Sequence, residues 1–294
     1  GFCVVGIDTF TPYYSVDLKK ERAKILRDMG LEVQNIDICD RERLQNIVLE
    51  NGITHIVHLA AQAGVRYSFT HPEVYLKTNI DGFLHILETC RMHPKVKLIY
   101  ASSSSVYGDN KKIPFSESDA TDCQTNVYGV TKKTNELMAY SYHHLYKIPS
   151  IGLRFFTVYG PWGRPDMAYF SFTKAIFESK PIEVFNEGMC RRDFTYVDDV
   201  VSAMLACLDC KSELAVYNIG NEHPELVNDL IGLIEKNSGK KAQKILMPMQ
   251  QGEIAETFAD TRLAREFLGF EPKTRLSEGI ANFVNWYRLW TKTT

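Results

Sequence analysis

ITHIVHLAA at residues 53–61 and VKLIYASSSS at residues 96–105 are two apolar runs that flank a helical pattern at residues 72–92. Apolar runs without polar alternation are typical of strands that are buried on both faces of a sheet. A helix between two such strands is typical of a parallel βαβ unit. These residues therefore predict a parallel sheet covered by helices, with function at the carboxyl ends of its strands.

The same alternation of strands and helices extends to both sides of this unit. Further apolar runs are FCVVGID (2–8), LEVQNID (31–37) and PSIGLRFF (149–156), and further helical patterns lie at 17–30, 40–52 and 126–146. After residue 160 the alternation becomes irregular. We therefore predict an α/β protein with a doubly wound parallel sheet in residues 1–160, to which residues 193–220 return. Residues 161–294 are predicted to form a smaller substrate-binding part.

The composition excludes several classes of protein. Of the 294 residues, 45% are hydrophobic and 24% are charged, which is typical of a globular chain. The net charge of −2 provides no basic surface for nucleic acid, and no apolar run approaches the roughly 20 residues that span a membrane. The seven cysteines are scattered, which predicts reduced thiols in a cytoplasmic protein. No histidine, cysteine and carboxylate residues have metal-ligand spacing, so no metal is expected.

Asp8 ends the first predicted strand, where a dinucleotide-binding fold places a carboxylate against the adenosine ribose. A 2′-phosphate would face a like charge there, so Asp8 favours NAD over NADP; a helix-capping or turn acid is the alternative. The glycine fingerprint of such folds lies roughly 20 residues before this acid, but only seven residues precede Asp8. We therefore expect that this chain lacks the first strand and helix of its sheet, which leaves its own binding of NAD open.

Tyr128 and Lys132 are four residues apart within the helical pattern 126–146, so they share one face of a helix. A free tyrosine has a pKa of about 10, and a nearby ammonium favours its phenolate form, which can act as a base. The helix follows YASSSSVYG (100–108), whose serines place hydroxyl groups at the end of a strand. This order predicts that Ser103, Tyr128 and Lys132 act together, with Ser103 sharing the proton held by Tyr128.

Several motifs together resemble the extended short-chain dehydrogenase/reductase family that acts on nucleotide sugars, and they cover nearly the whole chain. They are HLAAQAGVRYS (58–68), TNIDG (78–82), YASSSSVYG (100–108), NVYGVTK (126–132), LRFFTVYGPWGRPDMA (153–168), RRDFTYVDDV (191–200) and GEIAETFAD (252–260). The stretch from Phe156 to Ala168, in which Thr157 stands where many relatives carry asparagine, is most similar to the UDP-glucuronate 4-epimerases. The early segment from Asp8 to Leu26 shares this similarity.

The resemblance implies a Rossmann-like fold, NAD as cofactor and a UDP-sugar as substrate. For the cofactor it implies Asp37 and Ile38 beside the adenine, Ala60 and Ala61 against the ribose and phosphates, and contacts from the catalytic Tyr128 and Lys132; Asn79 would organise the active-site strands. For the substrate it implies Arg192 on the diphosphate and Glu253 on the uridine ribose. A loop acid at Asp37, a surface charge at Arg192 and a helix-capping acid at Glu253 are the alternatives.

The implied reaction is NAD-dependent 4-epimerisation of UDP-glucuronate to UDP-galacturonate through a 4-keto intermediate. That intermediate is a β-keto acid, so the enzyme must restrain its carboxylate, and Ser104, Ser105, Thr157 and Arg164 are the groups expected to do this. A residue that only braces its loop is the alternative role of Arg164. Ser104 and Ser105 replace the acids of family decarboxylases, which disfavours decarboxylation of UDP-glucuronate. A 4-epimerase for UDP-glucose or UDP-N-acetylglucosamine, and a non-catalytic nucleotide-sugar-binding protein, remain alternatives.

The resemblance also implies a homodimer. In this family two long helices of each subunit pair with their twofold mates, and the matching helical patterns here are residues 72–92 and 126–146. Packing inside one subunit would use the same apolar residues.

Overall fold

The structure, a computed structural model, describes residues 1–249 and 255–292. The chain divides into two compact units. The first comprises Gly1–Gly108, Thr121–Leu153 and Lys211–Val216, and the second comprises Asp109–Ala120, Arg154–Cys210 and Tyr217–Thr294. The functional division at residue 160 stays a prediction.

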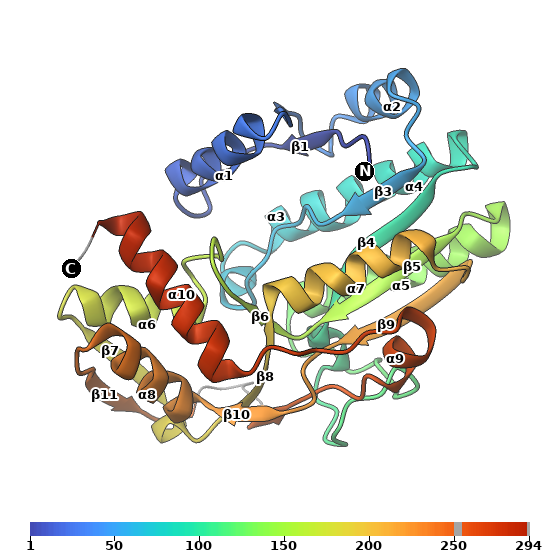
Figure 1. Cartoon of the computed structure of the whole chain (residues 1–294). Helices are drawn as coiled ribbons and strands as arrows, with labels where there is room; N and C mark the ends of the chain where they lie inside the picture. The colour runs from blue at the N-terminus through green and yellow to red at the C-terminus, as the bar shows by residue number, and fades with distance from the viewer. Residues whose placement is uncertain (250–254, 293–294) are drawn as a thin grey trace. The chain divides into compact units, whose positions relative to one another are not determined.

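Parallel strands form the first unit, which confirms the predicted α/β class (Figure 1). The strands are β1 (Gly6–Asp8), β2 (Val33–Asn35), β3 (His55–His58), β4 (Lys97–Ser103), β5 (Ser150–Phe155) and β9 (Leu214–Ile219). One sheet has the order β1-β2 and another the order β3-β4-β5-β9. The strand expected at residues 2–8 is shorter than its apolar run, because β1 pairs with β2 only from Gly6 to Asp8.

Helices cover these strands, and polar side chains fix where several of them begin. They are α1 (Val16–Asp28), α2 (Arg41–Glu50), α3 (Pro72–Tyr75), α4 (Gly82–Met92) and α5 (Val127–Tyr146). Ser15, Asp40 and Asn126 each accept a backbone N–H of the following turn, which satisfies donors that the helix leaves free. The single helix expected at 72–92 contains a π-helical turn at Leu76–Asp81 between α3 and α4.

The second unit is built around β8. Its strands are β6 (Thr157–Tyr159), β7 (Pro181–Phe185), β8 (Arg191–Tyr196), β10 (Pro224–Leu226), β11 (Gln243–Met247) and β12 (Glu256–Thr257); its helices are α6 (Ala168–Phe177), α7 (Val197–Asp209), α8 (Val227–Ser238), α9 (Arg262–Leu268) and α10 (Leu276–Thr291). β8 pairs with β6 and β12 in parallel and with β10 in antiparallel orientation. Aromatic packing between α6 and α10, centred on Phe170 and Phe283, forms part of its core.

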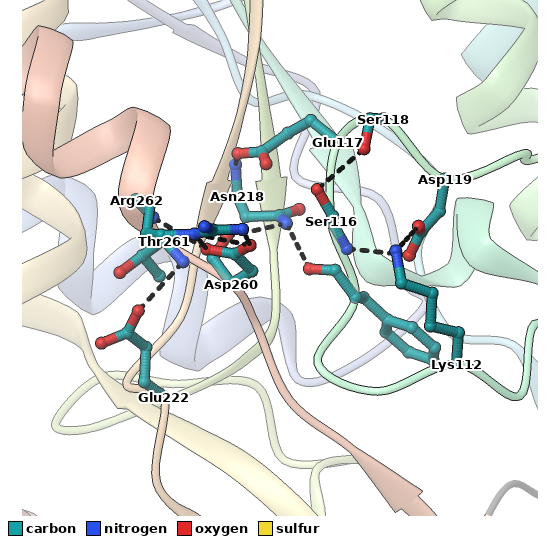
Figure 2. Close-up of polar contacts among 11 residues, drawn as sticks. Lys112, Ser116, Glu117, Ser118, Asp119, Asn218, Glu222, Asp260, Thr261 and Arg262 are labelled. Carbon is teal, nitrogen blue, oxygen red and sulfur yellow. Dashed lines mark hydrogen bonds and ion pairs between the residues drawn. The ribbon is translucent and has the colours of Figure 1, made fainter.

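A polar network fastens the segment Asp109–Ala120 within the second unit (Figure 2). The side chain of Asn218 donates to the carbonyl oxygens of Phe115 and Asp260, at 2.8 and 3.1 Å. The backbone N–H of Asn218 donates to Glu117 Oε1 at 2.7 Å, and burial raises the pKa of the Glu117 carboxyl. The guanidinium of Arg262 donates hydrogen bonds to both carboxylate oxygens of Asp260. Segments more than 100 residues apart in sequence are therefore held together.

No helix in the described part of the chain is long and apolar enough to cross a membrane. All seven cysteines are free thiols.

Candidate active site

Lys132 carries an ammonium group that is buried within the first unit. The residue is 2% exposed, and its Nζ donates a hydrogen bond of 2.7 Å to the carbonyl oxygen of Ala101 on β4. Burial lowers the pKa of Lys132 to about 8. Lys132 thus holds α5 against the strand that ends at Ser103, and it places a cation beside the end of that strand.

Ser103 occupies the last position of β4 and is buried. Its backbone is extended, and its Oγ accepts the N–H of Ser105 at 3.1 Å, which turns the chain into the 3-10 turn Ser104–Tyr107. Ser104 and Ser105 therefore follow the strand end in a tight turn, and both are partly exposed.

Tyr128 lies in the first turn of α5 and is partly exposed. Its ring makes an edge-on contact with Tyr75, with 6.2 Å between ring centroids. Gly129, the next residue, allows the helix start to approach the serine turn: a Cβ at Gly129 would lie 2.8 Å from the carbonyl oxygen of Ser105. Sequence reasoning missed this glycine; its position directly after Tyr128 is the signal that was available.

Asn79 is buried and bonds several segments of the first unit to one another, while its expected role as organiser of the active-site strands stays a prediction. Its side chain exchanges two hydrogen bonds with the backbone of Gln62, at 2.8 and 3.0 Å, and donates to Thr131 Oγ1 at 3.0 Å. Asn135 donates to the carbonyl oxygen of Asn79 at 2.6 Å. Because Asn79 lies in the π-helical turn, this turn joins the segment after β3 to α5. π-turns frequently mark functional sites.

His58 ends β3 and is buried against Phe83, with 5.5 Å between ring centroids. Burial, and secondarily the charge of Lys132, lower the pKa of His58 to about 3. His58 is therefore a neutral core residue at ordinary pH. The described residues contain no group of histidine, cysteine and carboxylate side chains that could hold a metal ion.

The residues expected to bind NAD lie at or beyond the ends of strands in the first unit. Asp8 ends β1, is exposed, and accepts the N–H of Phe10 at 2.6 Å through one carboxylate oxygen. Ala60 and Ala61 follow β3 and are exposed and partly exposed, respectively. Asp37 is exposed and accepts the N–H of Cys39 at 2.8 Å through one carboxylate oxygen, and its contact with the adenine stays a prediction.

Ile38 is 5% exposed and packs in the core. A Cβ at Gly82 would lie 2.6 Å from Ile38 Cδ1, so this glycine lets α4 pass close to the isoleucine. The side chain of Ile38 therefore contributes to the core, and its carbonyl oxygen lies 3.2 Å from His85 Nδ1.

The expected substrate residues Thr157, Arg164 and Arg192 lie in the second unit, and Glu253 lies outside the described residues. Thr157 begins β6. Arg164 forms an ion pair of 3.1 Å with Asp166 and donates to Met167 Sδ at 3.3 Å, so it is engaged within its own loop. Arg192 lies on β8 and donates to the carbonyl oxygen of Ala255 at 3.3 Å.

Asp193 is a residue whose importance the sequence did not reveal. Its buried carboxylate accepts the backbone N–H groups of Asn221, Glu222 and Ala259 and the hydroxyl of Thr195. Burial raises the pKa of its carboxyl, and these donors oppose the rise. Asp193 therefore fixes the strand that carries Arg192.

Comparison with known proteins identifies several relatives. Residues 4–220 match the NAD dependent epimerase/dehydratase family. The chain is 44% identical to UDP-glucuronate 4-epimerase 4 of Arabidopsis thaliana, over 97% of this chain and 69% of that protein. It resembles the crystal structure of UDP-glucuronic acid 4-epimerase from Bacillus cereus in complex with UDP-glucuronic acid and NAD (TM-score 0.90, 35% identity, 97% of this chain and 91% of that one). It also resembles UDP-glucose 4-epimerase of Thermotoga maritima with UDP-glucose (TM-score 0.89, 28% identity, 99% and 92%).

Proposed function

Because this chain belongs to the NAD dependent epimerase/dehydratase family, we propose that it catalyses the 4-epimerisation of UDP-glucuronate to UDP-galacturonate. The observation that carries the proposal is the buried Lys132, four residues after Tyr128 and bonded to the strand that ends at Ser103. The similarity to UDP-glucuronate 4-epimerases supports the choice of sugar.

The residues of the first unit fit NAD. Asp8 is exposed at a strand end, and a carboxylate that accepts one backbone N–H retains acceptor sites for ribose hydroxyls. Ala60 and Ala61 present small side chains after β3, where a cofactor can approach the backbone. The residues that would hold NAD are Asp8, Asp37, Ile38, Ala60 and Ala61, together with Tyr128 and Lys132. When bound, NAD would accept a hydride from C4 of the sugar and would return it to the opposite face of the 4-keto intermediate.

Tyr128 is the proposed base that removes the proton of the 4-hydroxyl group. The ammonium of Lys132 favours the phenolate form of Tyr128, because an adjacent positive charge lowers the pKa of a phenol. Ser103 shares the proton, and its place at the end of β4 puts its hydroxyl at the edge where parallel sheets bind ligands. After the 4-keto sugar has turned over in the site and C4 has been reduced from its other face, Tyr128 returns the proton to the oxygen at C4, so it acts as base and then as acid.

Restraint of the substrate carboxylate is the second requirement, because the 4-keto uronic acid can lose carbon dioxide. Ser104 and Ser105 offer neutral hydroxyl donors directly after Ser103. Thr157 and Arg164 are the proposed contacts from the second unit, with Arg192 on the diphosphate and Glu253 on the uridine ribose. Hydroxyl donors and a cation would offset the cost of burying the carboxylate.

A 4-epimerase for UDP-glucose is the second candidate. The pairing of Arg164 with Asp166 favours it, since a guanidinium that is already engaged is a weaker carboxylate receptor. The similarity to the UDP-glucose 4-epimerase of Thermotoga maritima points the same way.

We also propose that the protein is a cytoplasmic homodimer. α4 and α5 pack together and expose several apolar side chains, among them Met92, Leu137, Tyr140 and Leu145. Exposed apolar side chains on two adjacent helices are suited to an interface with a second copy. Seven free thiols agree with a reducing compartment. Light scattering of the wild type and of a Leu137→Glu/Tyr140→Glu variant tests the dimer: the variant should be monomeric, whereas a monomeric wild type would refute it.

The test of the reaction compares Tyr128→Phe with Tyr140→Phe, which makes the same chemical change on the same helix at a residue that is 62% exposed. The protein is supplied with NAD and UDP-glucuronate, and UDP-galacturonate is measured by chromatography. Tyr128→Phe should lower the rate at least about a hundredfold, the contribution of a general base, while Tyr140→Phe keeps it. Equal activity of both variants would refute the assigned base.

A further inference from the structure

The helix α5 carries a carboxylate that the proposed chemistry does not use. Glu136 is 7% exposed and Ser102 is 2% exposed, and Ser102 Oγ donates a hydrogen bond of 2.6 Å to Glu136 Oε1. Ser102 is the neighbour of Ser103 on β4. A buried carboxylate costs free energy unless it is paired and hydrogen-bonded, so its place beside the active site requires a physical account.

Glu136 belongs to a row of three residues on one face of α5. Tyr128, Lys132 and Glu136 follow one another at intervals of four residues, which aligns them along the helix. Lys132 bonds to Ala101 and Glu136 bonds to Ser102, so successive turns of the helix hold successive residues of the strand.

A second row on the same helix contacts a different element. Thr131 Oγ1 accepts from Asn79 Nδ2 at 3.0 Å, and Asn135 Nδ2 donates to the carbonyl oxygen of Asn79 at 2.6 Å. This row fixes α5 to the π-helical turn, whereas the row with Glu136 fixes it to β4. The bond between Ser102 and Glu136 therefore fixes α5 to the strand that ends at Ser103, a contact that the row with Asn79 does not make.

We propose that Glu136, through Ser102, is a positioning residue that sets the placement of Tyr128 relative to Ser103; the inference rests on the proposed epimerase reaction. A displacement of about 1 Å between reacting groups can cost roughly a hundredfold in rate. Two anchors one turn apart define both the position and the tilt of the helix against the strand, whereas Lys132 alone would define a single point.

Lys133 is a second, weaker partner of Glu136. Lys133 Nζ lies 3.7 Å from Glu136 Oε2, and the Lys133 side chain is 21% exposed. This distance is too long for a hydrogen bond, so we expect the pair to contribute less than the 2.6 Å bond to Ser102. Lys133→Met is therefore the matched control.

The experiment uses Glu136→Gln, which keeps an acceptor oxygen for Ser102, together with Glu136→Ala, Ser102→Ala and the double alanine variant. Each alanine variant should lower kcat by about ten- to a hundredfold, because a displacement of Tyr128 of up to about 1 Å costs up to roughly a hundredfold in rate, with KM for the UDP-sugar within twofold of wild type. Glu136→Gln and Lys133→Met should keep at least half of kcat. The double variant should be no slower than the slower single variant, because both changes remove the same bond.

Hydrogen–deuterium exchange of the peptide that contains β4 is measured on the same proteins without substrate. We expect exchange at least fivefold faster in the alanine variants and unchanged in Glu136→Gln and Lys133→Met. Three results would overturn the positioning role. They are losses of kcat that multiply in the double variant, a rise in KM in place of a fall in kcat, and a kcat of Glu136→Gln as low as that of Glu136→Ala. A wild type that epimerises no UDP-sugar would refute the proposed function instead. In that case, unaltered hydrogen–deuterium exchange in the alanine variants would still show that the bond between Ser102 and Glu136 does not hold β4.

Discussion

Lys132 Nζ lies 2.7 Å from the carbonyl oxygen of Ala101, two residues before Ser103 on the same strand. This bond holds a buried ammonium against the strand that ends at Ser103, on the same helix that carries Tyr128. Its environment also sets the pH at which that ammonium is lost, because burial lowers the pKa of Lys132 to about 8.

The rate of the reaction should therefore fall in alkaline solution. Above pH of about 8 the folded protein loses the Lys132 proton, and the phenolate of Tyr128 loses the positive charge that favours it. We expect kcat to decline with an apparent pKa near 8, and Lys132→Met to be at least about a hundredfold slower. Stopped assays from pH 6 to 10, at saturating substrate, measure this. A rate that rises steadily to pH 10 would contradict the role of the ammonium.

His58 should lower the free energy of unfolding in acidic solution. Burial lowers the pKa of His58 from 6.5 to about 3, so the unfolded chain binds a proton there before the folded chain does. The stability this residue contributes is complete above pH 6.5 and is lost as pH falls from 6.5 towards 3. At pH 4 the loss should be about 3 kcal/mol.

Urea unfolding at pH 7 and pH 4 tests this for wild type, His58→Gln and His144→Gln, the last at an exposed position. His58→Gln should lose less stability between the two pH values than wild type, while His144→Gln should match wild type. Identical losses in all three proteins would show that His58 does not titrate on unfolding.

Gly129 should be intolerant of a methyl group, whereas another helical glycine should accept one. A Cβ at Gly129 would lie 2.7 Å from Gln124 Oε1 and 2.8 Å from the carbonyl oxygen of Ser105, but a Cβ at Gly232 in α8 meets no atom within 4 Å. Gly129→Ala should lower the free energy of unfolding by about 1–3 kcal/mol and slow the reaction. Gly232→Ala should raise stability by about 0.5–1 kcal/mol. Thermal melting of both variants measures these changes in stability. Equal changes in Gly129→Ala and Gly232→Ala would contradict the close approach of Gly129 to Ser105.

Arg164 should discriminate between charged and neutral sugars if it binds the carboxylate. Arg164→Ala should then lower kcat/KM for UDP-glucuronate by a factor equivalent to about 1.5–3 kcal/mol of transition-state stabilisation. The kcat/KM for UDP-glucose should fall far less. Asp166→Ala releases the guanidinium from its ion pair and should lower KM for UDP-glucuronate. If Arg164→Ala weakens the use of both sugars equally, the residue only braces its loop.

The sequence predicted the α/β class, the parallel strands and the spacing of Tyr128 and Lys132, because periodicity and local spacing carry that information. It did not predict the π-helical turn at Leu76–Asp81, since that turn depends on bonds from Asn79 to Gln62 and Thr131, 17 and 52 residues away. The importance of Asp193 was hidden for the same reason.

For the residues expected to bind the substrate, the sequence left out a different kind of information, namely local contacts between neighbouring side chains. Arg164 was a candidate because of its charge, yet its ion pair with Asp166 is a local contact that a motif cannot reveal. Burial of Lys132 is a property of the assembled unit, so spacing indicated its role but not its lowered pKa.

Competition between two sugars tests the central claim most directly. Equal concentrations of UDP-glucuronate and UDP-glucose are supplied together with NAD, and the formation of UDP-galacturonate and UDP-galactose is followed by mass-resolved chromatography. The ratio of initial rates gives the ratio of kcat/KM values. We predict that UDP-galacturonate forms at least tenfold faster and that Tyr128→Phe abolishes both products. Faster formation of UDP-galactose would contradict the assignment to UDP-glucuronate.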